Sequence, residues 1–310
     1  MKRSSGDSMK HVFVVNPISG RGAAKELVEP IREVCERRGL NYEIRVTRDE
    51  SHGIRIAASY TKEDDVCLYA VGGDGTLWNV ISGVTEGVQF AVIPAGTGND
   101  FFRNLNRSQY DLMKLLEDTI DGEVIPVDYG TINDEVRFVN QICFGFDAEI
   151  NLDVCEKGKK SLMPKKFLYG TTAVRKAVSP KTVHYWMEYD GKREEYTRLV
   201  TTIQNGRYYG GGFYPAPMAD IDDGVFNLVA IGKVNTVQLI PLIAQYKKGE
   251  HLKNKKVTVH ELTDCRFEFD EEINVAVDGE LFKFKTMDIK MHHGGLLLRL
   301  PKESYHANRE

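Results

Sequence analysis

Residues 68–80 read LYAVGGDGTLWNV, and this stretch decides the fold of the first half of the chain. An apolar run ends in Gly-Gly-Asp-Gly-Thr at 72–76, and Leu77, Val80 and Ile81 then follow at helical spacing. The pattern predicts a buried strand, a tight glycine loop and a helix that Thr76 caps. Glycines let a backbone approach a ligand closely, and a helix start presents N–H groups to an anion. The carboxylate within the loop indicates a divalent metal beside bound phosphates, so we expect a nucleotide phosphate site.

Strand, loop and helix alternate on both sides of this stretch. The order predicts an α/β domain with a mostly parallel sheet and flanking helices. The loops at 16–22, 72–76 and 94–100, together with Thr47, follow the carboxyl ends of strands, where such sheets bind ligands. The other expected elements are strands at 10–15, 42–46 and 90–93 and helices at 23–38, which Gly39 ends, and at 53–60.

The second half of the chain is expected to be rich in β-strands. Tight turns such as Asp190-Gly191 and Asp278-Gly279 separate several of them, which indicates antiparallel pairing. Only two helices are expected to interrupt, near 165–177 and 236–247. We therefore predict a β-rich sandwich domain at 129–294. The expected strands are 138–144, 182–189, 196–205, 225–231, 255–260, 265–269, 273–277, 281–285 and, in a domain that the pattern leaves open, 295–300.

Length and composition fit a globular protein of two domains. The 310 residues exceed one average domain, and a net charge of −4 gives no reason to expect nucleic acid as partner. The five cysteines are dispersed without a CxxC spacing, which argues against a cysteine metal site and suits a reducing cytoplasm. Residues 1–9 lack an apolar core, so we expect a disordered extension rather than a secretory signal, with Met9 as an alternative start. No apolar run reaches the ~18 residues of a membrane span.

Each of the three loops also has a simpler interpretation. The loop at 72–76 matches neither the dinucleotide fingerprint nor a Walker A loop, and a bare strand-to-helix turn would explain only one or two of its glycines. The loop at 16–22 has Lys25 where a third glycine would stand; its N–H groups and Arg21 would suit phosphate, but an ordinary loop fits equally. Asp100 adds a second acid at the same rim, unless residues 96–100 form only an Asx-type turn.

Three motifs together resemble the diacylglycerol kinase catalytic-domain family: NPISGRG at 16–22, GGDGT at 72–76 and PAGTGNDF at 94–101. That family includes bacterial lipid kinases and the eukaryotic sphingosine and ceramide kinases. The resemblance continues through NGRYYGGG at 205–212, PMADIDDGVF at 217–226 and VDGE at 277–280. GGDGT is shared with NAD kinases, but the GTGND and DDG blocks favour the lipid-kinase branch. The resemblance implies an α/β nucleotide-binding domain at 10–128, which the C-terminal strand at 295–305 joins.

The resemblance also implies a role for each matching residue. Asp74 and Asp100 would position catalytic Mg²⁺, and Glu280 would be the general base that takes the proton from the lipid hydroxyl. A second, structural Mg²⁺ would be held by the carboxylate of Asp223 and the main-chain carbonyls of Asp220 and Val225. The co-substrate ATP would contact Asn16, Pro17, Ile18, Ser19, Gly20, Thr47, Gly72, Gly73, Asp74, Gly75, Thr76, Leu77, Trp78 and Thr97.

The late motifs carry less information by themselves. Asp278-Gly279 is a good type I′ hairpin turn, so an acid directly after it would be unremarkable without the resemblance. Asp220, Asp222 and Asp223 form either a solvated acidic loop or a cation site, because three carboxylates within four residues repel each other without a cation. Relatives commonly have Asn-Glu after GGDGT, where this chain has Trp78-Asn79, which makes a metal role at that position doubtful.

Residues 157–169 (KGKKSLMPKKFLY) combine five lysines with apolar side chains. This composition suits an anionic membrane surface, and a mobile linker with a solvated face is the alternative. We expect a cytoplasmic lipid kinase with peripheral contact at the inner face of the membrane, and a homodimer is compatible with the sequence. Two other functions stay open: a kinase for NAD or another soluble alcohol, and a non-catalytic regulator that binds a nucleotide or a lipid.

Overall fold

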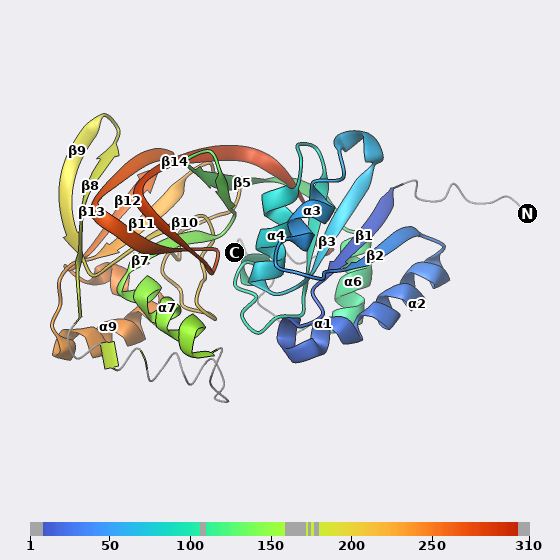
Figure 1. Cartoon of the computed structure of the whole chain (residues 1–310), viewed down its shortest axis with the longest axis horizontal. Coiled ribbons are helices and arrows are strands. Elements are labelled where there is room, and N and C mark those ends of the chain that lie inside the picture. The colour runs from blue at the N-terminus through green and yellow to red at the C-terminus, as the bar shows by residue number, and fades with distance from the viewer. Residues whose placement is uncertain (1–8, 106–109, 159–171, 173–174, 177–179, 303–310) are drawn as a thin grey trace, which may run out of the picture. The chain divides into compact units, whose positions relative to one another are not determined.

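The computed structural model describes residues 9–105, 110–158, 172, 175–176 and 180–302. These residues form two compact units, shown in Figure 1. The first consists of residues 9–129, 221–223 and 292–302, and the second of residues 130–220 and 224–291. The chain therefore enters each unit more than once.

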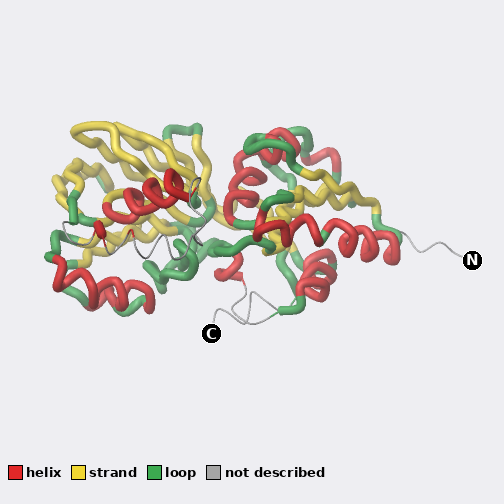
Figure 2. The backbone as a smooth tube through the Cα atoms, turned by 60° about the horizontal axis from the view of Figure 1, so that its bottom comes forward, coloured by secondary structure: helices red, strands yellow, loops and turns green. Residues whose placement is uncertain are grey.

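The first unit is an α/β domain with a parallel sheet. Its strands lie in the order β2-β1-β3-β4, and each neighbouring pair is parallel. Figure 2 shows helices on both sides of these strands. The main elements are β1 (Lys10–Val15), α1 (Ala23–Glu26), α2 (Val28–Arg38), β2 (Asn41–Val46), α3 (His52–Ala57), β3 (Val66–Gly72), α4 (Asp74–Gly83), β4 (Gln89–Pro94), α5 (Phe102–Leu105) and α6 (Leu112–Ile120).

The central strands of this sheet are buried on both faces, which explains their continuous apolar sequence. On one face, Phe13 and Tyr69 pack against Ile31 and Val34 of α2 and Leu116 of α6. On the other face, α4 packs against β1, β3 and β4, and α3 packs against α4. The expected helix at 23–38 is divided into α1 and α2. Its predicted end is confirmed, since Gly39 caps α2 with a φ of 65°.

The second unit is a β-sandwich. Its strands run in the order β12-β11-β10-β7-β13-β14, while β8 pairs with β13 and β9 pairs with β8. The elements are β6 (Val136–Phe138), β7 (Gln141–Gly145), α7 (Phe146–Gly158), β8 (Val183–Tyr189), β9 (Lys192–Arg198), β10 (Val200–Gln204), β11 (Phe226–Ile231), α9 (Thr236–Lys248), β12 (Val257–Leu262) and β13 (Asp264–Val277). Two strands, β5 (Val124–Ile132) and β14 (Glu280–Arg299), have residues in both units.

The two layers of the sandwich share strand β13. Its first half pairs with β8 and its second half with β7, and its register with β14 shifts between Glu268 and Ile273. A bulge of this kind bends a strand and lets it pass from one sheet to another. Ile142 and Phe144 of β7 point into the core between the layers, while Cys143 points to the opposite face, where Leu239 and Leu242 of α9 pack.

Several expected elements differ from the structure. The segments 265–269 and 273–277 form the single strand β13, and 281–285 and 295–300 both belong to β14. The expected strand 196–205 is divided between β9 and β10, and α6, β5 and α7 were not expected. Met9, placed in the N-terminal extension, is 6% exposed in the core of the first unit, and residues 1–8 lie outside the described residues.

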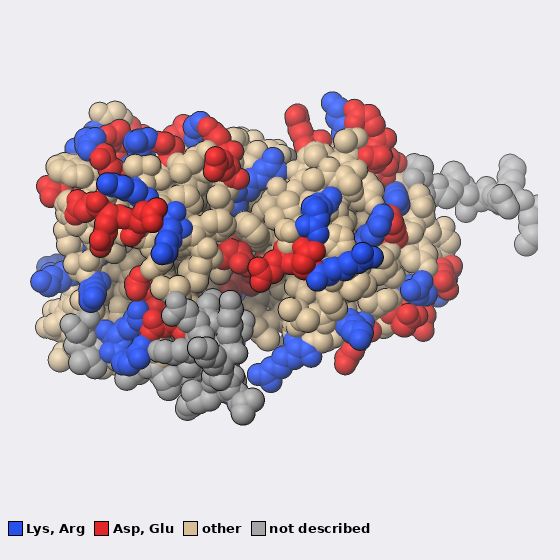
Figure 3. Space-filling model, in the orientation of Figure 1, with Lys and Arg blue, Asp and Glu red and all other residues tan. Residues whose placement is uncertain are grey.

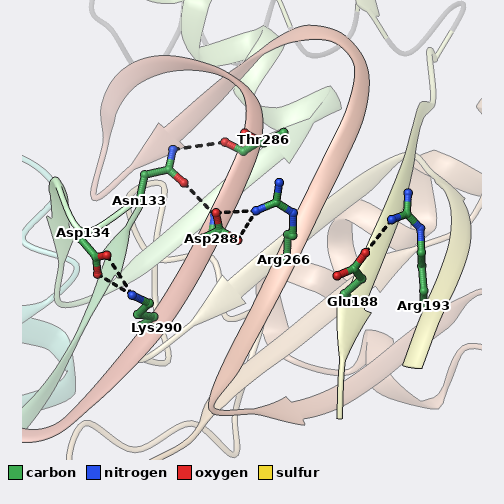
Figure 4. Close-up of polar contacts among 8 residues, drawn as sticks. All are labelled: Asn133, Asp134, Glu188, Arg193, Arg266, Thr286, Asp288 and Lys290. Atoms are coloured by element: carbon green, nitrogen blue, oxygen red, sulfur yellow. Dashed lines mark hydrogen bonds and ion pairs between the residues drawn. The ribbon is translucent and has the colours of Figure 1, made fainter. Parts of the chain in front are cut away.

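The outer face of the sandwich carries a ladder of paired charges (Figure 4). Lys290 pairs with Asp134 at 2.9 Å, Arg266 with Asp288 at 2.6 Å, and Arg193 with Glu188 at 2.6 Å. The backbone N–H of Asp288 also donates to Asn133 Oδ1 at 2.8 Å. This face is therefore charge-balanced.

Among the described helices, none is long and apolar enough to cross a membrane.

Candidate active site

Three loops of the first unit meet at the carboxyl ends of β1, β3 and β4. The backbone N–H of Gly73 donates to Ser19 Oγ at 3.0 Å, which joins the loop after β1 to the loop after β3. The backbone N–H of Ala95 donates to Gly72 O at 2.8 Å, which joins the loop after β3 to the loop after β4. The sequence-predicted residues Ser19, Gly72 and Gly73 are thus brought together in space.

Glycine is required where these loops touch. A β-carbon on Gly96 would lie 2.4 Å from the Cα of Gly73, and one on Gly20 would lie 2.1 Å from the carbonyl oxygen of Ala95. Gly20 also has a φ of 59°, in the left-handed region that favours glycine. Asn99 closes the third loop, because its amide accepts from the Gly96 N–H at 3.1 Å and donates to Gly96 O at 3.0 Å. The rim is compact, and most of its glycines are half-buried.

Asp74 and Asp100 border the same small space on this rim. A β-carbon on Gly98 would lie 2.8 Å from Asp74 Oδ2 and 3.7 Å from Asp100 Oδ2. Asp74 Oδ1 accepts from the Phe101 N–H at 3.3 Å, and Asp100, 6% exposed, has Arg103 Nε 3.5 Å from its Oδ1. Two carboxylates beside one glycine concentrate negative charge, which a cation would relieve.

The start of α4 differs from the expectation in one respect. The N-cap is Gly73, and Thr76 lies inside the first turn, where its N–H donates to Gly73 O at 3.0 Å. Thr76 is therefore not the cap, although it is part of the helix start. Its side chain is 3% exposed, and its Oγ1 has no hydrogen-bond partner within the described residues. The start of α4 lies on this rim, and helix starts attract anions because their first N–H groups lack intrahelical partners.

The remaining residues predicted to bind ATP occupy varied positions. Asn16 Oδ1 accepts from the Ile18 N–H at 3.3 Å, and the Ile18 side chain is 81% exposed. Thr47 follows β2, and its N–H donates to Val15 O at 2.9 Å. Leu77 is 3% exposed, and its N–H donates to Gly73 O at 3.1 Å. The other predicted positions are exposed or half-buried: Pro17, Gly75, Trp78 and Thr97.

Glu280 lies in the second unit, at the first residue of β14. The turn before it has the predicted conformation, with a φ of 47° at Asp278 and 92° at Gly279. The carboxylate of Asp278 accepts three backbone N–H bonds, from Val139, Asn140 and Gln141, at 2.7–3.0 Å. Asp278 is 7% exposed, and its burial raises its pKa to about 6 although these three donors favour the anion. Asp278 thus anchors the hairpin that carries Glu280, a role that the Asp-Gly pattern alone did not predict.

The acidic segment before β11 has an arginine beside its first carboxylate. Arg207 lies 3.6 Å from Asp220 Oδ2, and its Nε donates to Ala219 O at 2.7 Å. Part of the repulsion expected among Asp220, Asp222 and Asp223 is therefore relieved by Arg207. No group of three or more His, Cys, Asp or Glu side chains within the described residues is arranged to hold a metal ion. The metal roles of Asp220, Asp223 and Val225 stay predictions.

Two family models match the chain almost end to end. Residues 10–132 match the diacylglycerol kinase catalytic domain, and residues 140–293 match the YegS C-terminal NAD kinase beta sandwich-like domain. Residues 10–132 thus belong to the diacylglycerol kinase catalytic-domain family. The sequence resemblance to this family is thereby confirmed, as is the fold of an α/β domain followed by a β-sandwich.

Relatives in this family are similar over most of their length. The chain is 28% identical to a diacylglycerol kinase of Bacillus subtilis (strain 168) over 276 residues, which cover 86% of this chain and 88% of that one. A diacylglycerol kinase of Staphylococcus carnosus (strain TM300) is 28% identical over 271 residues, with coverage of 86% and 87%. The crystal structure of a candidate diacylglycerol kinase from Bacillus anthracis str. Sterne has a TM-score of 0.76 at 24% identity, with coverage of 95% and 98%.

Proposed function

We propose that this chain is an ATP-dependent lipid kinase that transfers the γ-phosphoryl group of ATP to the hydroxyl group of a diacylglycerol-like lipid. The proposal depends most on one observation: Asp74 and Asp100 border the space beside Gly98, on the rim where three loops meet. Relatives named diacylglycerol kinase supply the acceptor class. Phosphoryl transfer requires positioning and charge neutralisation more than covalent chemistry, which suits such a rim.

The residues of the first unit would bind the nucleotide. Backbone groups of Gly72, Gly73 and Gly75 at the start of α4 would hold the phosphates, since helix starts attract anions. Ser19 and Gly20 would support this loop from one side, and Thr97 would close it from the other. All the ATP contacts that the sequence resemblance implies are part of the proposal.

Mg²⁺ would be held by Asp74 and Asp100. The donor set fits this ion, because Mg²⁺ prefers oxygen ligands and is usually bound by one or two carboxylates together with phosphate oxygens. When bound, it would neutralise charge on the phosphates. A separate structural Mg²⁺ at Asp220, Asp223 and Val225 is part of the proposal.

Glu280 would act as the general base. A carboxylate at the exposed end of a hairpin can accept the proton of a substrate hydroxyl if it comes within hydrogen-bond reach. Asp278 would fix the hairpin on which Glu280 stands.

A substrate panel tests the acceptor. Purified protein is incubated with radiolabelled ATP and Mg²⁺, and with detergent-dispersed diacylglycerol, sphingoid bases or NAD. We expect label in the lipid fraction, with diacylglycerol the best acceptor. Label in NAD alone would support the second candidate, an NAD kinase, which the shared GGDGT motif and the description of the second-domain model favour. Binding of ATP and Mg²⁺ without any turnover would support a non-catalytic regulator.

Two substitutions test the roles of the acids. We expect Glu280→Gln and Asp74→Ala each to lower kcat with the best acceptor by ~10²-fold or more, because each removes a group that acts on the reacting atoms. Glu272→Gln is the matched control, since Glu272 is an exposed acid of the same unit. Circular dichroism checks that the variants are folded. Near-normal turnover by either variant would refute its assigned role.

The lipid would be reached at a membrane surface, with the protein bound peripherally at the cytoplasmic face. The basic segment at 157–169 was predicted to contribute to this contact. Nearly all of that segment lies outside the described residues, so its part in the proposal rests on composition alone.

A further inference from the structure

Helix α9 (Thr236–Lys248) is anchored in the second unit by its inner face. Leu239, Leu242 and Tyr246 are buried against the sandwich layer that contains Cys143. A capping box at its start fixes the helix further, because Asn235 accepts from the Gln238 N–H at 2.9 Å and the Gln238 side chain accepts from the Asn235 N–H. The helix is therefore rigidly placed within its unit.

The outer face of α9 is also apolar. Val237 is 80% exposed and Ile240 is 65% exposed, and Pro241 and Ala244 on the same side are exposed as well. These positions recur at the three- and four-residue spacing of one helix face. A surface helix normally carries charged or polar residues on its outer face, and a helix that is apolar all round is normally buried. The exposed face of α9 is therefore expected to be covered by a partner.

Lysines lie at the end of α9 and on both sides of it in the sequence. Residues 233–256 contain six lysines and a single acid, Glu250, in a chain whose net charge is −4. All six lysines are exposed, and none has an ion-pair partner among the described residues. This contrasts with Lys290 on the charge-balanced outer face, which pairs with Asp134. Figure 3 shows blue side chains at the lower left, close to where Figure 1 shows α9 and the short segment 175–176. The six are Lys233, Lys247, Lys248, Lys253, Lys255 and Lys256.

We propose that the outer face of α9 and these six lysines dock the protein on an anionic phospholipid surface. Helices that lie in a membrane interface typically carry aliphatic side chains on one face and lysines beside them. The apolar side chains would enter the acyl boundary, and the lysine stems would extend so that their ammonium groups reach the lipid phosphates.

Two other partners fit the surface less well. A second copy of the chain, related by a two-fold axis through α9, would bring like-charged lysines together. A nucleic acid would use the lysines, but the exposed face of α9 offers it no arginine and no aromatic ring on which a base could stack. Charge complementarity together with the aliphatic face selects an anionic lipid surface.

Vesicle flotation of the full chain tests the proposal. Vesicles of phosphatidylglycerol and phosphatidylcholine are compared with vesicles of phosphatidylcholine alone, without ATP and without an acceptor lipid. The result is therefore independent of the proposed phosphoryl transfer. We expect the partition coefficient of the wild type to be at least about tenfold higher on the anionic vesicles and to fall in 0.5 M NaCl, because salt screens the attraction between lysines and lipid phosphates.

Two pairs of substitutions localise the contact. The double substitution Val237→Gln with Ile240→Gln introduces a good helix former at both positions, so α9 should stay folded. It is expected to lower the partition coefficient by about tenfold or more. Lys247→Gln with Lys248→Gln is expected to lower it by roughly fivefold for each lysine. The matched control is Lys181→Gln with Lys192→Gln, two exposed lysines of the same unit, which is expected to stay within about twofold. Unchanged thermal unfolding shows that the variants retain the fold.

Four results would overturn the proposal. These are a wild type that does not bind anionic vesicles, and a Val237→Gln/Ile240→Gln variant that binds them as the wild type does. The third is a wild type that binds an RNA or DNA oligonucleotide but not vesicles. The fourth is a wild-type dimer, seen by analytical ultracentrifugation without vesicle binding, that the same variant dissociates.

Discussion

Asp278 and Asp190 begin two hairpin turns of the same Asp-Gly chemistry, but only one of them supports a candidate catalytic residue. Both have a positive φ, 47° and 50°, and both are followed by glycine. Asp190 is exposed, whereas Asp278 is buried and accepts three backbone N–H bonds from residues 139–141. The same two letters of sequence therefore have different structural consequences, which depend on what the fold brings beside them.

Asp278→Asn should be far more harmful than Asp190→Asn. An amide keeps one acceptor oxygen but turns an NH₂ group toward backbone donors, so at least one buried N–H loses its partner. We expect a loss of about 2–3 kcal/mol in the free energy of unfolding for Asp278→Asn and less than about 0.5 kcal/mol for Asp190→Asn. Urea titration at pH 7.5 measures both. Equal losses would show that Asp278 anchors nothing.

His251 provides a pH-dependent contribution to stability. It is completely buried beside the ring of Tyr246, with centroids 4.4 Å apart, and burial lowers its pKa to about 4 from 6.5. Because the folded state favours the neutral ring, this contribution is complete above pH 6.5 and is lost as the pH falls toward 4. Between pH 7 and pH 4, we expect the wild type to lose roughly 3 kcal/mol more than His251→Gln. Urea titrations of both proteins across this range would detect it; parallel losses would refute it.

At the scale of elements, sequence patterns located most strands but not their limits. The core strands of the first unit matched closely, since a short apolar run buried on both faces has few alternatives. Strand β13 was predicted as two strands because Asp270, Glu271 and Glu272 interrupt its pattern; these residues are exposed where its register shifts. Strand β5 was missed because its sequence contains Pro126 and Asp128.

Asp128 shows why local patterns fail for such elements. It is completely buried, and its Oδ1 accepts from His293 Nδ1 at 2.8 Å and from the Gly294 N–H at 2.7 Å. Partners 165 residues away in sequence make this burial favourable, so no local pattern reports it. The same limit applies to the candidate site. The loops and their acids could be predicted from motifs, whereas the contacts of Asn99 and Asp278 depend on tertiary structure.

Arg299 near the end of β14 ties three elements together. Its Nη1 donates to Ile120 O at 3.1 Å and to Gly122 O at 2.9 Å, at the end of α6, and its Nη2 donates to Gln89 Oε1 at 3.0 Å. Arg266, in contrast, makes an exposed ion pair with Asp288.

Substitution of these two arginines by methionine should distinguish the hydrogen bonds of Arg299 to backbone carbonyls from the exposed ion pair of Arg266. Arg299→Met is expected to lower the free energy of unfolding by about 3 kcal/mol, because it leaves half-buried carbonyls without donors. Arg266→Met is expected to cost less than about 1 kcal/mol, as for other exposed pairs. Urea midpoints measured side by side decide the matter, and similar shifts for the two variants would contradict it.

On the scale of the whole molecule, the two units are interleaved in sequence. The first unit takes its last sheet strand from β14, where Leu297 and Leu298 pair in parallel with Gln89 and Phe90 of β4. Without this strand, β4 would become an unpaired edge although all but one of its residues are buried. A domain cut at residue 129 therefore lacks part of its own sheet.

This arrangement predicts how fragments behave. Residues 9–129 alone should not fold cooperatively, because they lack Leu296, Leu298 and Leu300, which are 0–4% exposed. Burial of these three side chains contributes about 6 kcal/mol, comparable with the net stability of a domain. The same fragment joined to residues 292–302 by a short Gly/Ser linker should fold, since Tyr129 and His292 stack with centroids 4.4 Å apart and leave little distance to span. Thermal melts followed by circular dichroism compare the two. A cooperative transition of residues 9–129 alone, at the temperature of the linked form, would show that β14 is dispensable to the first unit.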